Sequence, residues 1–337
     1  MRQLVVTGLL SEASILDDGL VLHCSWRRNH GVRVDVGGEP ILFVKRTARP
    51  AGPRQEASNI RALARAGLSA ILPVILDEGV SVGTMVLKYA PGVDLRAYHH
   101  EHWGQTTSVA HALGIALGRL HVLDYRSVGG KLPVLDGRVL RLMDDPTTAI
   151  ADLGPGERNV LAIVGGDRAL ADLAAHAGDM WSPRCVIHGD LRWDNAIASR
   201  AEASTVMLVD WEHAGIGDPA WDLAMCFSDY VAAWIAASRE ASDSEVSIAA
   251  PCALGDVHSA IGAMLSGYAS SGAIVNPGDI ERLPYYVAVR LVHSALELSA
   301  GYERCPRLGV LQLQLASNVA RNPRTAFLDL FGILGSS

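Results

Sequence analysis

The first quarter of the chain contains the short apolar runs and turn residues that are typical of β-strands. The runs that predict strands are Leu20–Ser25, Val32–Val36, Ile41–Lys45, Pro73–Leu76 and Thr84–Tyr89. Gly37-Gly38 is a strong turn signal between the second and the third of these runs. Between the third and the fourth, Arg54–Ala66 places its apolar residues on one helical face and ends before Gly67. This region is therefore predicted to form a small sheet with one inserted helix.

Helical periodicity dominates after the breaker Ala90-Pro91-Gly92. Ser108–Leu123 repeats its apolar residues on one face, and the chain from Ala220 onwards is rich in alanine, leucine and valine at helical spacing. Residues 125–165 have no clear pattern and are expected to be irregular. Three short strands are expected at Cys185–Ile187, Ala196–Ala198 and Thr205–Val209. The pattern predicts an α+β protein with two lobes, residues 1–90 and 91–337, joined by a hinge near Pro91.

Composition narrows the class of protein. The chain has 337 residues, 49% of them hydrophobic, and its five cysteines include no CxxC pair, which indicates reduced thiols. A formal charge of −7 excludes a generally basic nucleic-acid-coating protein. The N-terminus does not resemble a secretory signal, and the longest stretch without charged residues, Val257–Gly278, is too polar for a membrane span. We expect a cytoplasmic protein with no nucleic-acid or membrane partner, and the oligomeric state stays open.

Charge is distributed unevenly along the chain. Residues 26–65 contain nine basic and three acidic side chains, whereas residues 220–280 contain seven acidic side chains and one arginine. Two solvated surfaces would explain this difference. It also fits an anion-handling region followed by a region that tolerates cations.

The chemistry is concentrated where polar residues follow short apolar strands. Asp190 follows the first of these strands, Asn195 lies five residues on, and Asp210 follows a later strand, so the strands can hold all three side chains at one end. One carboxylate can orient a hydroxyl and accept its proton, while an amide oxygen and a second carboxylate can bind Mg²⁺. Phosphoryl transfer requires this set of groups.

The motif His188-Gly189-Asp190-x-x-x-x-Asn195, together with Asp210-Trp211-Glu212, resembles the aminoglycoside phosphotransferase-like family, which is related to protein kinases. The block Gly217–Ala224 is similar to the next conserved block of that family. The resemblance implies a bilobal protein-kinase-like fold with a small antiparallel-sheet N-lobe and a larger, mostly helical C-lobe. It also implies that the enzyme uses ATP and Mg²⁺.

The same resemblance implies a role for each matching residue. Asp190 would act as the base, and Asn195 and Asp210 would hold Mg²⁺. Lys45, fixed by Glu56, would contact the ATP phosphates. The segment with Lys88, Tyr89 and Ala90 would be the hinge that binds adenine, and Asp222 would brace the catalytic loop by accepting hydrogen bonds.

The sequence departs from the family pattern in two places. No GxGxxG loop is present, and Trp26–Gly31 stands in its place, where Arg27, Arg28 or His30 could contact phosphate or simply form a solvated hairpin tip. Arg192 stands where aminoglycoside enzymes often carry histidine and Ser/Thr protein kinases carry lysine. Its guanidinium could neutralise the transferring phosphoryl group, and it raises the prospect of a peptide hydroxyl as acceptor.

Three functions remain in play. The first is transfer of the γ-phosphate to a hydroxyl of a small molecule, such as a cationic aminoglycoside or amino alcohol. The alternatives are a kinase that phosphorylates serine or threonine of a peptide, as in lanthipeptide-type modification, and a pseudokinase scaffold or binding subunit. Retention of the whole residue set argues for an enzyme.

Acidic side chains of the second lobe could attract a cationic acceptor, although surface acids without a specific role explain most of them. These are Asp229, Glu240, Asp243, Glu245 and Asp256. Arg290, His293 and Glu297 share a helical face and could line a pocket that faces the catalytic loop.

Three aromatic or histidine features near the motifs have ordinary structural explanations. His99-His100-Glu101-His102 lacks HExxH spacing, and four adjacent side chains cannot all point one way, so a metal site there is not expected. Trp193 could stack on a substrate or pack in the core. His188 is expected to be a structural hydrogen-bonding residue.

Overall fold

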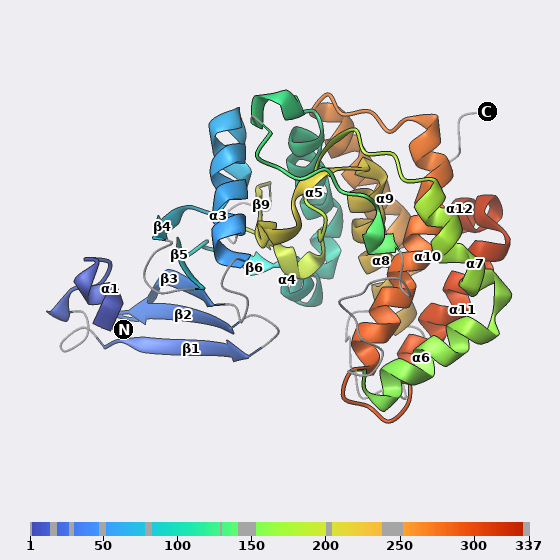
Figure 1. The fold of residues 1–337 in the computed structure, drawn as a ribbon, viewed down its shortest axis with the longest axis horizontal. Coiled ribbons are helices and arrows are strands. Elements are labelled where there is room, and N and C mark those ends of the chain that lie inside the picture. The colour runs from blue at the N-terminus through green and yellow to red at the C-terminus, as the bar shows by residue number, and fades with distance from the viewer. Residues whose placement is uncertain are drawn as a thin grey trace.

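The computed structural model describes residues 2–13, 19–26, 30–46, 52–77, 83–128, 130–140, 153–199, 204–237 and 252–332. It has a small lobe built on a sheet and a larger lobe that is mostly helical, as Figure 1 shows. The predicted α+β architecture is therefore confirmed. The exact division at residue 90 stays a proposal.

The small lobe contains one antiparallel sheet of five strands in the order β1-β2-β3-β5-β4. The strands are β1 (Val21–Trp26), β2 (His30–Val36), β3 (Glu39–Arg46), β4 (Ile75–Asp77) and β5 (Thr84–Lys88). All five predicted strands are present, and their ends lie within two residues of the predicted ones.

Helices cover both faces of this sheet. On β5, Met85 and Leu87 pack with Ala57 of helix α3 (Gly52–Leu63), whereas Val86 belongs to the cluster that contains Leu4 of α1 (Arg2–Val6). Because side chains alternate along a strand, β5 is buried on both sides. The predicted helix over residues 54–66 is confirmed, although it ends in a π-helical turn (Ala64–Leu68) in which Gly67 has φ 98°.

The large lobe is a bundle of helices around one continuous core. They are α4 (Leu95–His102), α5 (Thr106–His121), α6 (Pro155–Gly166), α7 (Arg168–Asp179), α8 (Pro219–Ala237), α9 (Leu254–Ser270), α10 (Pro277–Ser299), α11 (Arg307–Arg321) and α12 (Pro323–Phe331). Helices α5 and α9 approach so closely that a Cβ on Gly114 would lie 1.9 Å from the Met264 carbonyl oxygen. Over the described ranges, no helix combines the length and the apolarity that a membrane crossing needs.

The expectation of irregular structure throughout residues 125–165 is wrong for its last part. Helix α6 occupies Pro155–Gly166, and Val160 and Val164 are buried on its inner face. Proline at the first helical position is favourable, but the glycines at both ends hide the helical pattern in the sequence. Residues 141–152 of this segment lie outside the described residues.

Short strands in the large lobe support the segments that carry the motifs. β7 (Cys185–Ile187) pairs with β10 (Gly215–Gly217), and β8 (Ala196–Ala198) pairs with both β6 (Val93–Asp94) and β9 (Val206–Leu208). The predicted strands at 185–187 and 196–198 are confirmed, and the third is shorter than predicted. The loop over residues 188–195 thus begins at β7 and ends at β8.

Candidate active site

The start of the loop between β7 and β8 is held by hydrogen bonds to a buried aspartate. Asp222, near the start of α8, accepts hydrogen bonds from the backbone N–H groups of His188 (2.7 Å) and Gly189 (2.9 Å), as expected of a residue that braces the loop. His121 Nε2 lies 3.2 Å from the same carboxylate. Gly189 has φ +81°, and a Cβ there would lie 2.5 Å from the His213 carbonyl oxygen, so the turn requires glycine.

His188 has the structural role that the sequence suggests. Its side chain is buried, and Nε2 lies 2.9 Å from the Val209 carbonyl oxygen. This contact ties the start of the loop to the strand end that precedes Asp210.

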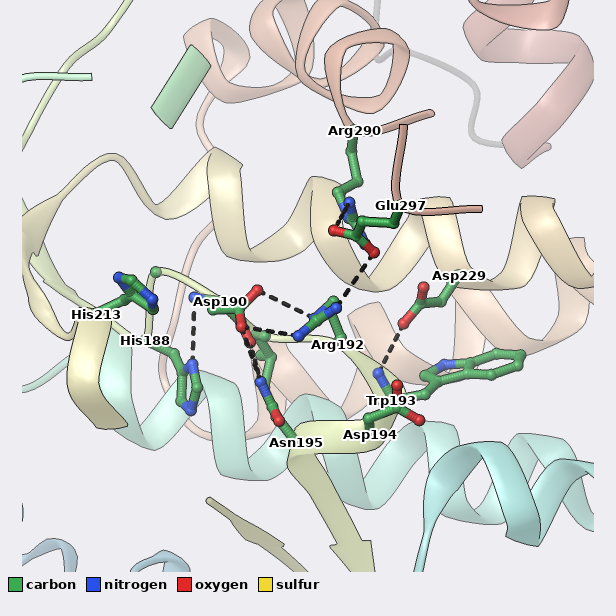
Figure 2. Close-up of polar contacts among 12 residues, drawn as sticks. His188, Asp190, Arg192, Trp193, Asp194, Asn195, His213, Asp229, Arg290 and Glu297 are labelled. Atoms are coloured by element: carbon green, nitrogen blue, oxygen red, sulfur yellow. Dashed lines mark hydrogen bonds and ion pairs between the residues drawn. The ribbon is translucent and has the colours of Figure 1, made fainter. Parts of the chain in front are cut away.

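Asp190 emerges from this loop as a partly exposed carboxylate (Figure 2). Asn195 Nδ2 donates to the Asp190 carbonyl oxygen at 2.7 Å and to Oδ2 at 3.1 Å, so the amide oxygen of Asn195 points away from Asp190. Arg192 Nη2 donates to the same Oδ2 at 3.2 Å. Three of the predicted site residues therefore lie together.

The remaining members of the motif set meet between the lobes. Lys45 on β3 forms an ion pair with Glu56 of α3 at 2.6 Å and a second, very close one with Asp210. Burial lowers the pKa of Lys45, but the two carboxylates outweigh it and raise the pKa overall, which keeps the ammonium charged. Burial raises the pKa of Glu56, and the lysine opposes that rise.

Asp210 occupies a strained position at the start of the 3₁₀ turn η8 (Trp211–His213). It has φ 69° and ψ 59°, and it is the only described non-glycine residue with positive φ. The small lobe holds this turn at two points: Trp211 N–H donates to Glu56 Oε1 at 3.3 Å, and Asn59 Nδ2 donates to the Trp211 carbonyl oxygen at 2.9 Å. Asn59 was not singled out from the sequence, because nothing in its local pattern distinguishes it from other helical asparagines.

Oxygen ligands gather around Asp210. Carboxylate oxygens of Glu56, Asp210 and Glu212 lie within 4.8 Å of one another. Hard cations such as Mg²⁺ prefer oxygen ligands of this kind. Because the Glu56 side chain is 1% exposed, whereas those of Asp210 and Glu212 are 27% and 26% exposed, Asp210 and Glu212 are the more available members of the group.

The predicted hinge follows the end of β5. The backbone N–H of Lys88 donates to the Val74 carbonyl oxygen at 2.9 Å, and that of Tyr89 donates to the Ile41 carbonyl oxygen at 3.1 Å. These bonds extend the sheet, so the backbone N–H groups of two of the three predicted hinge residues are already used. Ala90 is half-buried, and its N–H makes no hydrogen bond to another described residue.

The aromatic and histidine features have structural roles. Trp193 is buried between His99 and Tyr230, with ring centroids 4.3 and 4.9 Å away, so the substrate-stacking interpretation is wrong. Burial lowers the pKa of His99 to about 3, consistent with a neutral core histidine. His293 is half-buried, with its ring centroid 6.1 Å from that of Trp221.

The charged surfaces predicted from the sequence are described only in part. Arg27, Arg28, Arg49, Glu240, Asp243 and Glu245 lie outside the described residues, as do the side-chain surroundings of His30. Arg33 forms an ion pair with Asp35 at 2.9 Å. The two described acids among those that could attract a cation have local partners, since Asp229 accepts the Trp193 N–H at 2.7 Å and Asp256 accepts the Ala253 N–H at 2.9 Å.

Comparison with known proteins identifies the family to which the chain belongs. The sequence pattern of the phosphotransferase enzyme family matches residues 28–247. Viomycin phosphotransferase from Streptomyces vinaceus is 29% identical over 211 residues, which cover 58% of this chain and 70% of that protein. A macrolide 2′-phosphotransferase from Brachybacterium faecium has a similar fold, with a TM-score of 0.52 and 17% identity over 97% of this chain and 99% of that chain. For an ethanolamine kinase from Plasmodium vivax the TM-score is 0.57, with 14% identity over 94% of this chain and 86% of that chain. The chain therefore belongs to the phosphotransferase enzyme family and has its protein-kinase-like fold.

Proposed function

We propose that the protein transfers the γ-phosphoryl group of ATP, with Mg²⁺, to a hydroxyl group of a small molecule. The observation that carries the proposal is the convergence of two residue groups. Lys45, Glu56 and Asp210 meet between the lobes, and Asp190 with Asn195 forms the adjoining catalytic loop. Such a complete set favours catalysis over the pseudokinase alternative, because a scaffold has no need of all five side chains.

The residues present fit a nucleotide and a magnesium ion. Lys45 is a buried ammonium in contact with the carboxylates of Glu56 and Asp210, and it is suited to bind phosphate oxygens. The backbone N–H of Ala90 is suited to donate a hydrogen bond to adenine. The Asn195 amide oxygen and the Asp210 carboxylate would hold Mg²⁺, with Glu212 close by. When bound, the ion supplies charge neutralisation on the phosphates.

Asp190 would orient the acceptor hydroxyl and accept its proton as the hydroxyl oxygen attacks phosphorus. Its Oδ2 accepts hydrogen bonds from Asn195 and Arg192, whereas Oδ1 lies 3.2 Å from Arg192 Nε without a hydrogen bond and would accept one from the hydroxyl. Arg192 would neutralise charge on the transferring phosphoryl group. Its Nε lies 3.2 Å from Asp190 Oδ1 without a hydrogen bond, so its positive charge is held beside the proposed base.

Relatives favour a small-molecule acceptor over the peptide alternative. By their names, viomycin phosphotransferase, the macrolide enzyme and ethanolamine kinase each act on a small molecule. The acceptor need not be cationic, because the described carboxylates Asp229 and Asp256 are engaged locally. A screen must therefore include compounds of low charge.

The test is transfer of ³²P from labelled ATP, with GTP as the competing donor. The acceptors are viomycin, kanamycin, a macrolide, ethanolamine and a Ser/Thr peptide. We expect labelling of at least one small molecule; labelling of the peptide alone would overturn the choice of acceptor, and the absence of any Mg²⁺-dependent thermal shift with nucleotide would overturn the kinase function.

A variant separates chemistry from binding. Asp190→Asn should lower the transfer rate by roughly 10²–10⁴-fold, the usual contribution of a general base. It should keep the Mg²⁺-dependent thermal shift with ATP, because Asn195 and Asp210 remain. Loss of that shift together with activity would argue against the assigned roles.

A further inference from the structure

Helix α10 reaches the catalytic loop through a pair of charged side chains two turns apart. Glu297 accepts hydrogen bonds from Arg290 Nη1 at 3.1 Å and from Nη2 at 3.3 Å (Figure 2). Arg290 is buried, whereas Glu297 is 39% exposed at its side chain. A fork-shaped pair with one buried partner fixes the carboxylate on the helix.

The same carboxylate also contacts the catalytic loop. Arg192 Nη1 donates to Glu297 Oε2 at 3.3 Å across a sequence separation of 105 residues. Burial raises the pKa of Glu297, but Arg290 and Arg192 outweigh it and lower the pKa, so the carboxylate stays ionised. Arg192 therefore faces one carboxylate on each side, Asp190 and Glu297.

The contact between Arg192 and Asp190 is incomplete. Nη2 donates to Oδ2 at 3.2 Å, whereas Nε lies 3.2 Å from Oδ1 without a hydrogen bond. An arginine with no competing partner would be free to form the full two-pronged pair with a carboxylate. That pair would occupy Oδ1, the oxygen assigned above to the acceptor hydroxyl.

We propose that Glu297, held by Arg290, is a positioning residue that draws the Arg192 guanidinium partly away from Asp190. The contact between Nε and Oδ1 then stays an ion pair without a hydrogen bond, so Oδ1 remains able to accept one from the acceptor hydroxyl. The proposal rests on the proposed function, because it assigns Glu297 no contact with substrate and lets it act only through Arg192.

The first experiment compares Glu297→Gln with Glu281→Gln, using the compound of the panel that is labelled most rapidly. Glu281 lies on the same helix, is exposed, and undergoes the same loss of charge. We expect Glu297→Gln to lower kcat by roughly 10- to 100-fold, the range for a lost hydrogen bond between charged groups. The KM for ATP should change less than about twofold, because Lys45 and the hinge are untouched, and Glu281→Gln should match the wild type.

The second experiment asks whether Glu297 acts through Arg192. In an Arg192→Met background, Glu297→Gln should cause no further loss of kcat beyond about twofold, because the side chain that it positions is gone. An equal loss in both backgrounds would overturn the inference. If the wild type transfers no phosphate to any acceptor, the proposed function fails; if the wild type is active and Glu297→Gln equals Glu281→Gln, only the inference fails.

Glu297→Asp guards against a folding defect. It keeps a negative charge for the buried Arg290 but retracts the carboxylate from Arg192 by one methylene. We expect kcat to fall in the order wild type, Glu297→Asp, Glu297→Gln, with each melting temperature recorded. If Glu297→Gln does not fold, the same cycle with Arg192→Met is run with Glu297→Asp, and unchanged kcat for that variant would refute the positioning role.

Discussion

Replacing Asp222 by asparagine tests how the fold holds the catalytic loop. The carboxylate is buried and has three donors around it: the backbone N–H groups of His188 and Gly189 and the Nε2 of His121. Asparagine has nearly the same shape but offers one acceptor oxygen, and its NH₂ group must face a donor. With its oxygen in the place of Oδ2, the amide keeps the contacts of His188 and His121, so we expect the Gly189 contact to be lost.

The expected size follows from these contacts. A hydrogen bond to a charged group contributes roughly 1.5–3 kcal/mol, so Asp222→Asn should lower the free energy of unfolding by about 1.5–3 kcal/mol. Domains are stable by about 5–15 kcal/mol, so the variant should still fold at low temperature. Displacement of the loop by about 1 Å would move Asp190 out of line and lower kcat by roughly 10²-fold.

Urea unfolding monitored by tryptophan fluorescence gives the stability change, and ³²P transfer gives the activity. Asp172→Asn is the matched control, because Asp172 is exposed on α7 and, within the described part of the chain, its only ion pair is with exposed Arg168 at 3.5 Å. The control should change the free energy of unfolding by less than about 0.5 kcal/mol. A stability and a kcat for Asp222→Asn that both match the control would refute the bracing role.

Two further predictions concern buried ionisable groups. Glu56→Gln leaves Lys45 with Asp210 as its remaining carboxylate, so the KM for ATP should rise by roughly tenfold, equivalent to the loss of one charged hydrogen bond; an unchanged KM would argue against Lys45 as the phosphate contact. Burial lowers the pKa of His99 to about 3, so the unfolded chain binds the extra proton and the folded protein loses stability as pH falls below about 6.5. Between pH 6.5 and 4.5, the free energy of unfolding should fall by about 2.5 kcal/mol less in His99→Leu than in the wild type, as measured by urea unfolding at each pH. An equal decrease in both proteins would contradict the prediction.

The sequence was most informative about structure that local residue patterns determine and about the motifs of the proposed site. Strands around tight turns are local features, so all five strands of the small lobe could be predicted to within two residues. The motifs of the proposed site follow one another along the chain in the order of the family that they resemble. They contain Lys45, Glu56, Asp190, Asn195 and Asp210. The structure brings them into the two adjoining groups that the predicted roles require.

Contacts between distant parts of the chain could not be predicted in the same way. The sequence indicates only that Glu297 could line a pocket, because its contact with Arg192 depends on how α10 packs against the loop. The aromatic ring of Trp193 could stack on a substrate, and only the positions of His99 and Tyr230 show that it belongs to the core. Packing of one helix against another decides such cases, and no local spacing encodes it.

Asp210 shows why the two lobes must be considered together. A left-handed conformation at a non-glycine residue costs about 1–2 kcal/mol, and it persists only where its surroundings hold it. Here the small lobe supplies the holding contacts, from Lys45 to the carboxylate and from Glu56 and Asn59 to the backbone of the next residue. A movement of α3 relative to the large lobe would therefore displace the proposed metal ligand and the proposed phosphate contact together. The geometry for phosphoryl transfer is set at this interface between the lobes rather than within either one.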